Sequence, residues 1–167
     1  MRAQPQFPNE QTGTGEFKRQ SDAFRHWVTE DGRSGYPAAA GRYHLYVSLA
    51  CPWAHRTIIV RALKGLTEVI GMTVVDPIRD DQGWAFHNGP GHSLDTTKGF
   101  HFLSEAYRAT DPNYHGRVTV PVLWDRVTKR IVTNSDDDLM RIFNGEFNRF
   151  TTSRLDLYPA ALRPQID

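Results

Sequence analysis

The chain has 167 residues, 39% of them hydrophobic, which is enough for one domain of ordinary size with a buried core. Its 20 basic and 19 acidic residues give a net charge of +1 and are interleaved, so neither nucleic acid nor an anionic membrane is indicated as a partner. No apolar run approaches the roughly 20 residues that span a bilayer, and residues 1–20 lack the apolar stretch of a secretory signal. The single cysteine cannot form an internal disulfide, and we therefore expect a reducing compartment, most simply the cytoplasm.

The first 41 residues are predicted to form an N-terminal arm and a loop. Residues 1–20 are rich in Gln, Gly, Pro and Thr, which predicts a poorly ordered arm. The first apolar residues close enough to pack together predict a short helix or an extended segment; they are Phe24, Trp27 and Val28. Small residues with Gly and Pro predict a loop over 32–41.

A strand, a helix and a second strand are expected next. Residues 42–48 alternate between apolar and polar, as in a strand. Apolar residues recur at helical spacing over 57–66, and Pro52 suits the first helical turn because its missing N–H removes no intrahelical bond. The short β-branched run at 72–75 predicts a strand parallel to the first.

A long insert over 79–116 separates this unit from the second half. It contains a predicted helix at 102–109, and ordered loops of this length are often functional. Residues 118–124 and 130–132 predict a hairpin, and apolar spacing over 139–143 predicts a last helix. Three candidates for its N-cap precede it: Asn134, Ser135 and Asp136.

A βαβ half followed by a ββα half is typical of the thioredoxin-like fold, an α/β architecture, which we assign to residues 42–148. That fold has a cysteine at the first strand-to-helix turn and a cis-proline facing it; here they would be Cys51 and Pro121. Mid-strand prolines are otherwise confined to edges and bulges, so an ordinary trans edge proline is the alternative.

Cys51, within the run LACPWAHR at 49–56, is predicted to be a reactive thiol at the start of a helix. The free N–H groups and the helix dipole favour its thiolate, and His55 and Arg56 are candidates to stabilise it further. A dithiol oxidoreductase would carry its second cysteine where this chain has Ala54, so a mixed disulfide would need an external thiol to resolve it. A buried structural cysteine is the alternative.

The run CPWAHR, followed by ALKGL at 62–66, resembles the glutathionyl-hydroquinone reductases, also called Xi-class glutathione transferases. The resemblance covers most of the chain from about residue 42. It continues in VVDP at 74–77, GW at 83–84, VTVPVLWD at 118–125 and LYPAALR at 157–163. On this resemblance, residues 149–167 begin the segment between the family's two domains.

The resemblance implies a reductase whose cysteine thiolate attacks the glutathione sulfur of a glutathionyl-hydroquinone. The resulting mixed disulfide is released by a second glutathione. The implied cosubstrate is therefore glutathione, the other substrate is an aromatic thioether, and no metal is needed. Residues carried over to glutathione binding are Trp84, Arg117, Val118 and Val120, the last through strand-like hydrogen bonds. A packing role for Trp84 is the alternative.

Two features depart from the family. Its Asn-Glu-Ser after the fourth strand is replaced here by Asn134-Ser135-Asp136, with the hydroxyl and the carboxylate in reversed order. Either Ser135 and Asp136 exchange roles, or another low-molecular-weight thiol is the cosubstrate; a solvated helix N-terminus is the simplest interpretation. The family also has a helical C-terminal domain that lines the hydroquinone pocket and builds the dimer. We expect this chain to be the N-terminal domain alone.

Three functions stay open on the sequence. They are a glutathione-dependent reductase that needs its second domain, a stand-alone monothiol oxidoreductase resembling one-cysteine glutaredoxins, and a non-catalytic thioredoxin-like binding module. A metal site is not predicted, because the seven histidines and one cysteine show no paired ligand spacing such as Cys-x-x-Cys or His-x-x-x-His.

Overall fold

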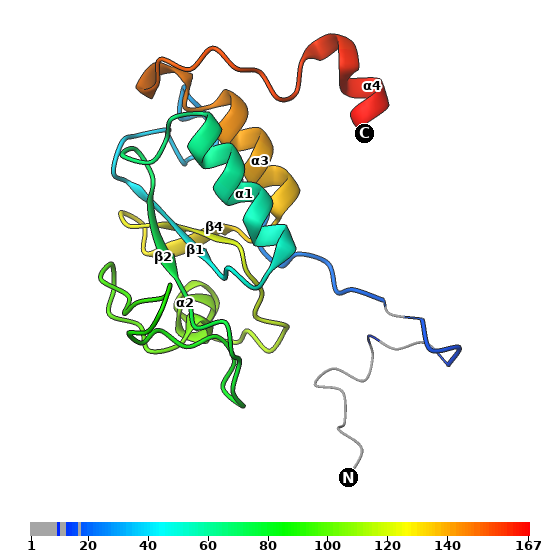
Figure 1. The fold of residues 1–167 in the computed structure, drawn as a ribbon, viewed down its shortest axis with the longest axis vertical. Helices are drawn as coiled ribbons and strands as arrows, with labels where there is room; N and C mark the ends of the chain where they lie inside the picture. Colours follow the sequence, from blue (N-terminus) through cyan, green and yellow to red (C-terminus); the bar gives the residue numbers. More distant parts are fainter. Residues whose placement is uncertain (1–9, 11–12, 17) are drawn as a thin grey trace.

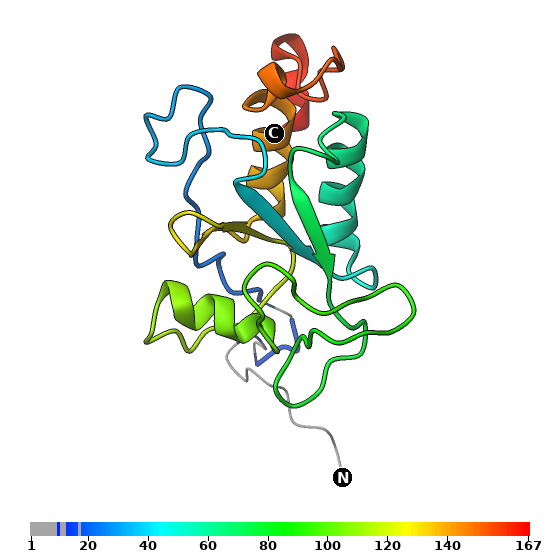
Figure 2. The same ribbon diagram turned by 90° about the vertical axis from the view of Figure 1, so that its left-hand side faces the viewer.

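A four-stranded mixed sheet forms the centre of the computed structural model, which describes residues 10, 13–16 and 18–167 (Figures 1 and 2). Strand β1 pairs in parallel with β2 and antiparallel with β3, and β3 pairs antiparallel with β4, giving the order β2-β1-β3-β4. The strands are β1 (Tyr43–Val47), β2 (Gly71–Val74), β3 (Val122–Asp125) and β4 (Arg130–Thr133). The predicted thioredoxin-like order of elements is confirmed.

Helices cover both faces of this sheet. Helices α1 and α3 lie side by side on one face, and α2 packs against β4 on the other (Figures 1 and 2). The helices are α1 (Pro52–Leu63), α2 (Leu103–Thr110), α3 (Asp136–Gly145) and the short α4 (Arg163–Ile166), with 3-10 turns at Asn148–Phe150 and Ala160–Leu162. No helix among the described residues is both long and apolar enough to cross a membrane.

The ends of α1 and α3 follow from local chemistry. Pro52 occupies the first turn of α1, as predicted. The helix ends at Leu63, and Gly65 just beyond it adopts a left-handed φ of 66°, as expected of a glycine at a helix end. Helix α3 begins after Ser135, whose hydroxyl accepts a hydrogen bond from the Asp138 N–H at 3.3 Å, so Ser135 is the cap among the three candidates.

Strand β3 is shorter than the sequence predicts. It begins at Val122 rather than at 118, because Pro121 has no N–H to give to the ladder. The Val120–Pro121 peptide bond is cis, as expected. The backbone of 118–120 therefore lies outside the sheet.

The segment around Phe24 is extended, which decides between the two predicted conformations. Arg25 forms a single antiparallel bridge with Thr133 of β4. Asn134 holds Phe24 through two hydrogen bonds. The Asn134 side-chain oxygen accepts from the Phe24 backbone N–H at 2.9 Å, and the Asn134 backbone N–H donates to the Phe24 carbonyl at 3.1 Å. The segment covers the edge of the sheet at β4.

The arm predicted to be poorly ordered is mostly exposed at the residues that the structure describes, namely 13–16, 18 and 19, with one buried residue, Glu10. Residues 1–9, 11–12 and 17 lie outside the described part. Glu10 is only 3% exposed, and its carboxylate is paired with Arg117. The composition of the arm could not predict this contact, because Arg117 lies 107 residues further along the chain than Glu10.

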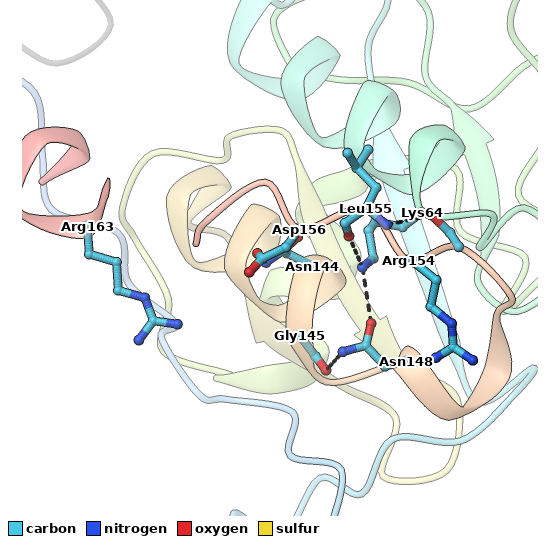
Figure 3. A pocket seen from close by; sticks show the side chains of 9 residues that line it. Lys64, Asn144, Gly145, Asn148, Arg154, Leu155, Asp156 and Arg163 are labelled. Carbon is cyan, nitrogen blue, oxygen red and sulfur yellow. Dashed lines mark hydrogen bonds between the residues drawn. The ribbon is translucent and has the colours of Figure 1, made fainter. Parts of the chain in front are cut away.

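Residues 151–155 pack against the C-terminal end of α1, and Asp156 and Leu157 hydrogen-bond to the Asn144 side chain of α3 (Figure 3). The ammonium group of Lys64, a residue only 2% exposed, donates to the Asn148 side chain at 3.1 Å and to the Leu155 carbonyl at 2.6 Å. Thr151 completes the contact by donating to the Lys64 carbonyl at 2.6 Å. An open cavity of about 350 Å³ lies beside these groups.

Candidate active site

Cys51 lies where β1 leads into α1. It is the N-cap residue, with an extended backbone, and its carbonyl accepts the first helical hydrogen bond from His55 at 3.0 Å. Its half-buried thiol donates to the Val120 carbonyl at 3.7 Å. The sulfur is thus held between the helix N-terminus, where N–H groups have no intrahelical acceptor, and the residue before the cis-proline.

A cavity of about 160 Å³ opens beside the sulfur. Five of the residues that the sequence analysis assigned to the site line it together: Cys51, Trp84, Arg117, Val118 and Val120. Four further lining residues were not predicted: Arg19, Trp53, Arg79 and Thr119. Of these four, only Trp53 could have been predicted from the sequence, because it lies two residues after Cys51 in the same run.

Arginines give this cavity a basic rim. The guanidinium of Arg79 lies 5.1 Å from the centre of the Trp84 ring, and that of Arg19 lies 5.8 Å from the Trp53 ring. Loss of hydration, and secondly the charge of Arg117, lower the pKa of Arg79, which reflects how near the two guanidinium groups are. Arg19 pairs with Asp22 and Arg117 with Glu10, so part of this positive charge is already balanced. The two tryptophans and the arginines around the thiol suit a ligand that is partly apolar and carries some negative charge.

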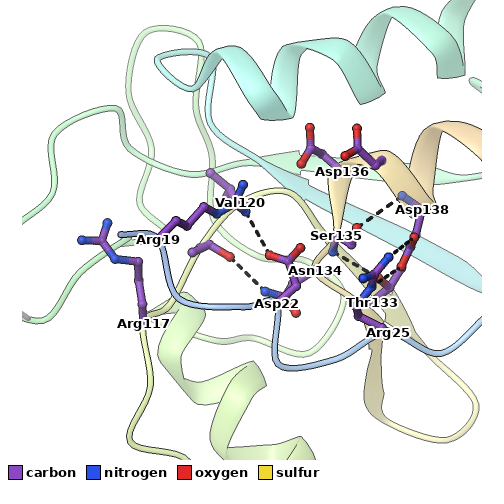
Figure 4. Close-up of polar contacts among 12 residues, drawn as sticks. Arg19, Asp22, Arg25, Arg117, Val120, Thr133, Asn134, Ser135, Asp136 and Asp138 are labelled. Carbon is purple, nitrogen blue, oxygen red and sulfur yellow. Dashed lines mark hydrogen bonds and ion pairs between the residues drawn. The ribbon is translucent and has the colours of Figure 1, made fainter. Parts of the chain in front are cut away.

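A second group of polar residues follows β4, next to this cavity (Figure 4). Asn134 donates to the Thr119 hydroxyl at 3.1 Å and so connects the group to the cavity wall. The carboxylate of Asp138 accepts two hydrogen bonds from Arg25, at 2.8 and 2.6 Å. Burial raises the pKa of the Asp22 carboxyl despite the nearby charge of Arg19.

Comparisons with known proteins identify the family of the chain. Residues 50–139 match the model of the glutathione S-transferase N-terminal domain. The chain belongs to the glutathione S-transferase family.

Relatives of this transferase domain include two enzymes named glutathionyl-hydroquinone reductase. YqjG of Escherichia coli is 47% identical over 92% of this chain and 49% of its own length. PcpF of Sphingobium chlorophenolicum is 42% identical over 92% of this chain and 48% of its own length. The predicted resemblance is confirmed, and the chain spans about half the length of the curated relatives it matches.

Solved transferase structures agree with the fold. The Xi glutathione S-transferase of Phanerochaete chrysosporium superimposes with a TM-score of 0.86 at 44% identity, covering 90% of this chain and 52% of that one. The glutathione-bound structure of E. coli YqjG gives a TM-score of 0.83 at 47% identity, covering 86% and 49% of the two chains.

Four of the predicted site residues are arranged differently from expectation within the described part of this transferase domain. None of His55, Arg56, Ser135 and Asp136 lines the cavity beside Cys51. Arg56 pairs with the carboxylates of Asp136 and Asp137 on α3, so its charge is already partnered there. The Ser135 hydroxyl caps its own helix, and His55 is an exposed residue one turn into α1.

One cluster of potential metal ligands escaped the sequence analysis. Asp76, His87 and His92 each offer a ligand atom, and the three atoms lie within 4.8 Å of one another. Their spacings of 11 and 5 residues match no familiar metal-binding motif, because an irregular loop rather than one helix brings them together.

Proposed function

We propose that this chain is the thiol-binding domain of a glutathionyl-hydroquinone reductase and that Cys51 is the nucleophile. The observation that carries the proposal is the position of the chain's one cysteine, at the start of α1 and in the wall of a cavity with a basic rim. The names and identities of the relatives support the same reaction class.

The proposed reaction has two exchanges at sulfur. The Cys51 thiolate attacks the glutathione sulfur of the glutathionyl-hydroquinone, forming an S–S bond as the carbon–sulfur bond breaks. The ring carbon keeps that electron pair and takes a proton, so hydroquinone leaves. The thiolate of a second glutathione then attacks the glutathione sulfur of the mixed disulfide, which frees Cys51 and yields oxidised glutathione.

We expect the peptide part of glutathione to bind along the backbone of residues 118–120. Because β3 begins only at Val122, this stretch is outside the ladder and an extended peptide can pair with it. Trp84 and Arg117, which line the same cavity, would contact the same ligand. At about 160 Å³ the cavity is smaller than the ~300–1,000 Å³ typical of sites for drug-sized ligands, so we expect the thiol end to be enclosed and the rest to lie along the surface.

The role of the Ser135-Asp136 pair decides between glutathione and another small thiol. Both residues already have intramolecular partners, namely the Asp138 N–H and the Arg56 guanidinium. If they also hold the γ-glutamyl group of glutathione, Arg56 would have to release Asp136 in part. Ser135→Ala and Asp136→Asn are expected to weaken glutathione more than they weaken cysteine in the same exchange assay.

Purified wild-type chain and its Cys51→Ser and Cys51→Ala variants test the proposal. Each is incubated with a glutathionylated hydroquinone and glutathione, and hydroquinone release is followed by chromatography. Intact-mass spectrometry after addition of oxidised glutathione detects the mixed disulfide. We expect the adduct only in the wild type, and any hydroquinone release to need Cys51 and to be faster when a full-length relative replaces this chain.

The outcomes separate the alternatives. Formation of the mixed disulfide without hydroquinone release, together with turnover of a glutathionylated protein as substrate, would favour a monothiol oxidoreductase of the glutaredoxin kind. Neither adduct nor release would favour a non-catalytic binding module. Hydroquinone release by Cys51→Ser at the wild-type rate would exclude Cys51 as the nucleophile.

A further inference from the structure

Three side chains with metal-binding groups converge at the end of β2, away from the residues that line the Cys51 cavity. Asp76 follows that strand, and His87 and His92 belong to the long insert. The Asp76 Oδ2 and His87 Nε2 atoms are 2.8 Å apart, and the two imidazole rings have centres 5.0 Å apart. The Asp76 side chain is only 13% exposed, and that of His87 is 56% exposed, so the cluster opens to solvent on one side.

Backbone hydrogen bonds hold the three residues in this arrangement. The Asp76 N–H donates to the Ala85 carbonyl at 2.9 Å, which places the start and end of the intervening loop side by side. Ser93, next to His92, donates its N–H to the Val74 carbonyl of β2 at 3.2 Å. The ligand-bearing segments are therefore fixed to the same strand end without help from an ion.

Hydrogen bonds also orient the side chains of His92 and Asp76. The His92 Nδ1–H donates to the His87 carbonyl at 2.7 Å, which selects the tautomer with an unprotonated Nε2. The Asp76 Oδ1 atom accepts from the Ile78 N–H at 2.6 Å, which leaves Oδ2 toward the cluster. Two of the three ligands, His92 and Asp76, thus have a partner on the far side, as ligands of built metal sites typically do.

The absence of a side chain at Gly89 leaves room for the imidazole of His92. A Cβ atom built on Gly89 would overlap the His92 Nε2 atom. The two residues also exchange backbone hydrogen bonds of 3.2 and 3.3 Å, which holds the imidazole over the glycine. A side chain at position 89 would therefore displace the His92 ligand atom.

We propose that Asp76, His87 and His92 bind Zn²⁺, with a fourth position left to water. Two imidazoles and one carboxylate are a common zinc ligand set, and at bond lengths of about 2.0–2.2 Å tetrahedral ligand atoms are roughly 3.3 Å apart. The Asp76–His87 pair needs to open by about half an ångström to match. The ion joins the ends of a loop that carries Arg79 and Trp84, both in the wall of the Cys51 cavity, and thereby stiffens that wall.

Isothermal titration of the untagged chain with Zn²⁺ alone tests the site. The Cys51→Ser background removes the one thiol that could compete for the ion. We expect one Zn²⁺ per chain and a higher midpoint of thermal unfolding with zinc than without it. Asp76→Asn, His87→Gln and His92→Gln should each lower the affinity at least about tenfold, because even the loss of an outer partner of a ligand typically costs 10–100-fold.

Two further variants sharpen the test. Gly89→Ala leaves all three ligands in the sequence but is expected to lower the affinity by displacing His92. His101→Ala removes an exposed histidine of the same insert outside the cluster and should keep the parent affinity. Circular dichroism confirms that each variant is folded before its affinity is read.

Either of two results would contradict the proposed zinc site. Absence of a one-to-one binding step in the parent, or parent-like affinity in folded Asp76→Asn and His87→Gln, would show that the cluster is an ion pair only. Cys51 is replaced throughout, so the result is independent of the proposed reductase activity.

Discussion

The guanidinium of Arg56 on α1 is paired with the carboxylate of Asp136 in the first turn of α3. The carboxylate is 4% exposed, whereas the Arg56 side chain is 46% exposed, so the arginine covers a buried charge at the junction of the two helices. Asp137 lies 3.4 Å from the same guanidinium. The sequence suggested Arg56 as a partner of the thiolate, and the structure gives it two carboxylates instead.

Arg56→Gln is expected to destabilise the domain by about 1–3 kcal/mol, because it leaves the buried Asp136 carboxylate without its cation. Urea unfolding at pH 7 measures the change. Arg141→Gln, which removes an exposed pair with Asp167, is the matched control and should change stability by less than about 1 kcal/mol. If Arg56 serves the thiolate instead, Arg56→Gln would slow alkylation of Cys51 and leave the unfolding free energy unchanged.

His44 on β1 should make stability depend on pH in the weakly acidic range. Burial, and secondly the charge of Arg126, lowers the pKa of this imidazole from 6.5 to about 4, and its Nε2 contacts the Thr73 hydroxyl at 2.7 Å. As pH falls, His44 takes up its proton in the unfolded chain before it does so in the folded chain. The free energy of unfolding is therefore highest above pH 6.5 and falls by roughly 3 kcal/mol in total between about pH 6.5 and 4.

Urea unfolding of His44→Gln at several pH values checks this expectation. The variant should show a flatter profile over that interval than wild type. His115→Gln, which replaces an exposed histidine, should keep the wild-type profile. An unchanged slope in His44→Gln would show that other groups cause the loss.

Asp125 at the end of β3 is expected to control stability at lower pH. Burial alone would raise the pKa of its carboxyl. The carboxylate accepts hydrogen bonds from Arg42 at 2.9 and 2.6 Å, from the Val127 N–H and from the Thr128 hydroxyl. These bonds outweigh the effect of burial, so the pKa of Asp125 is lowered. The resulting stability is present above the ordinary pKa of 3.8 and is lost as pH falls through the lower folded value. Asp125→Asn should cost about 3–5 kcal/mol at pH 7. The difference from wild type should shrink below about pH 4 in acid titrations of unfolding; a constant difference would contradict the assignment.

Trp84 is expected to contribute to ligand binding more than to folding, because it is partly exposed and its ring lies under Arg79 in the cavity wall. Trp84→Ala in the Cys51→Ser background should weaken glutathione about tenfold by calorimetry, whereas Trp84→Phe keeps a ring and should weaken it less. Equal affinity in both variants and the parent would leave Trp84 with a packing role only.

Lys64 should determine how firmly residues 151–155 are held on α1. Lys64→Met removes the donor to Asn148 and Leu155, and trypsin should then cut faster after the exposed Arg154. Lys98→Met removes an exposed lysine, and with it the same number of tryptic sites, so it is the matched control. Equal cleavage rates in both variants would show that other contacts hold this segment.

The sequence alone determined the order of the elements and the place of Cys51 at the start of α1. Alternation over 42–48, helical spacing after Pro52 and the turn before Arg130 are local patterns, and local patterns suffice to predict strands, helices and a hairpin. The place of Cys51 beside Val120 followed too, because the order of elements brings the first helix start to the third strand.

Only the tertiary structure decided which charges meet. The pairs Arg56–Asp136 and Glu10–Arg117 join residues 80 and 107 positions apart, so no periodicity reveals them. The same holds for the arginines around the cavity and for Asp76, His87 and His92, which an irregular loop gathers at one strand end. A side chain's chemistry is written in the sequence, but its pKa, its partner and its access to a ligand depend on neighbours that folding alone supplies.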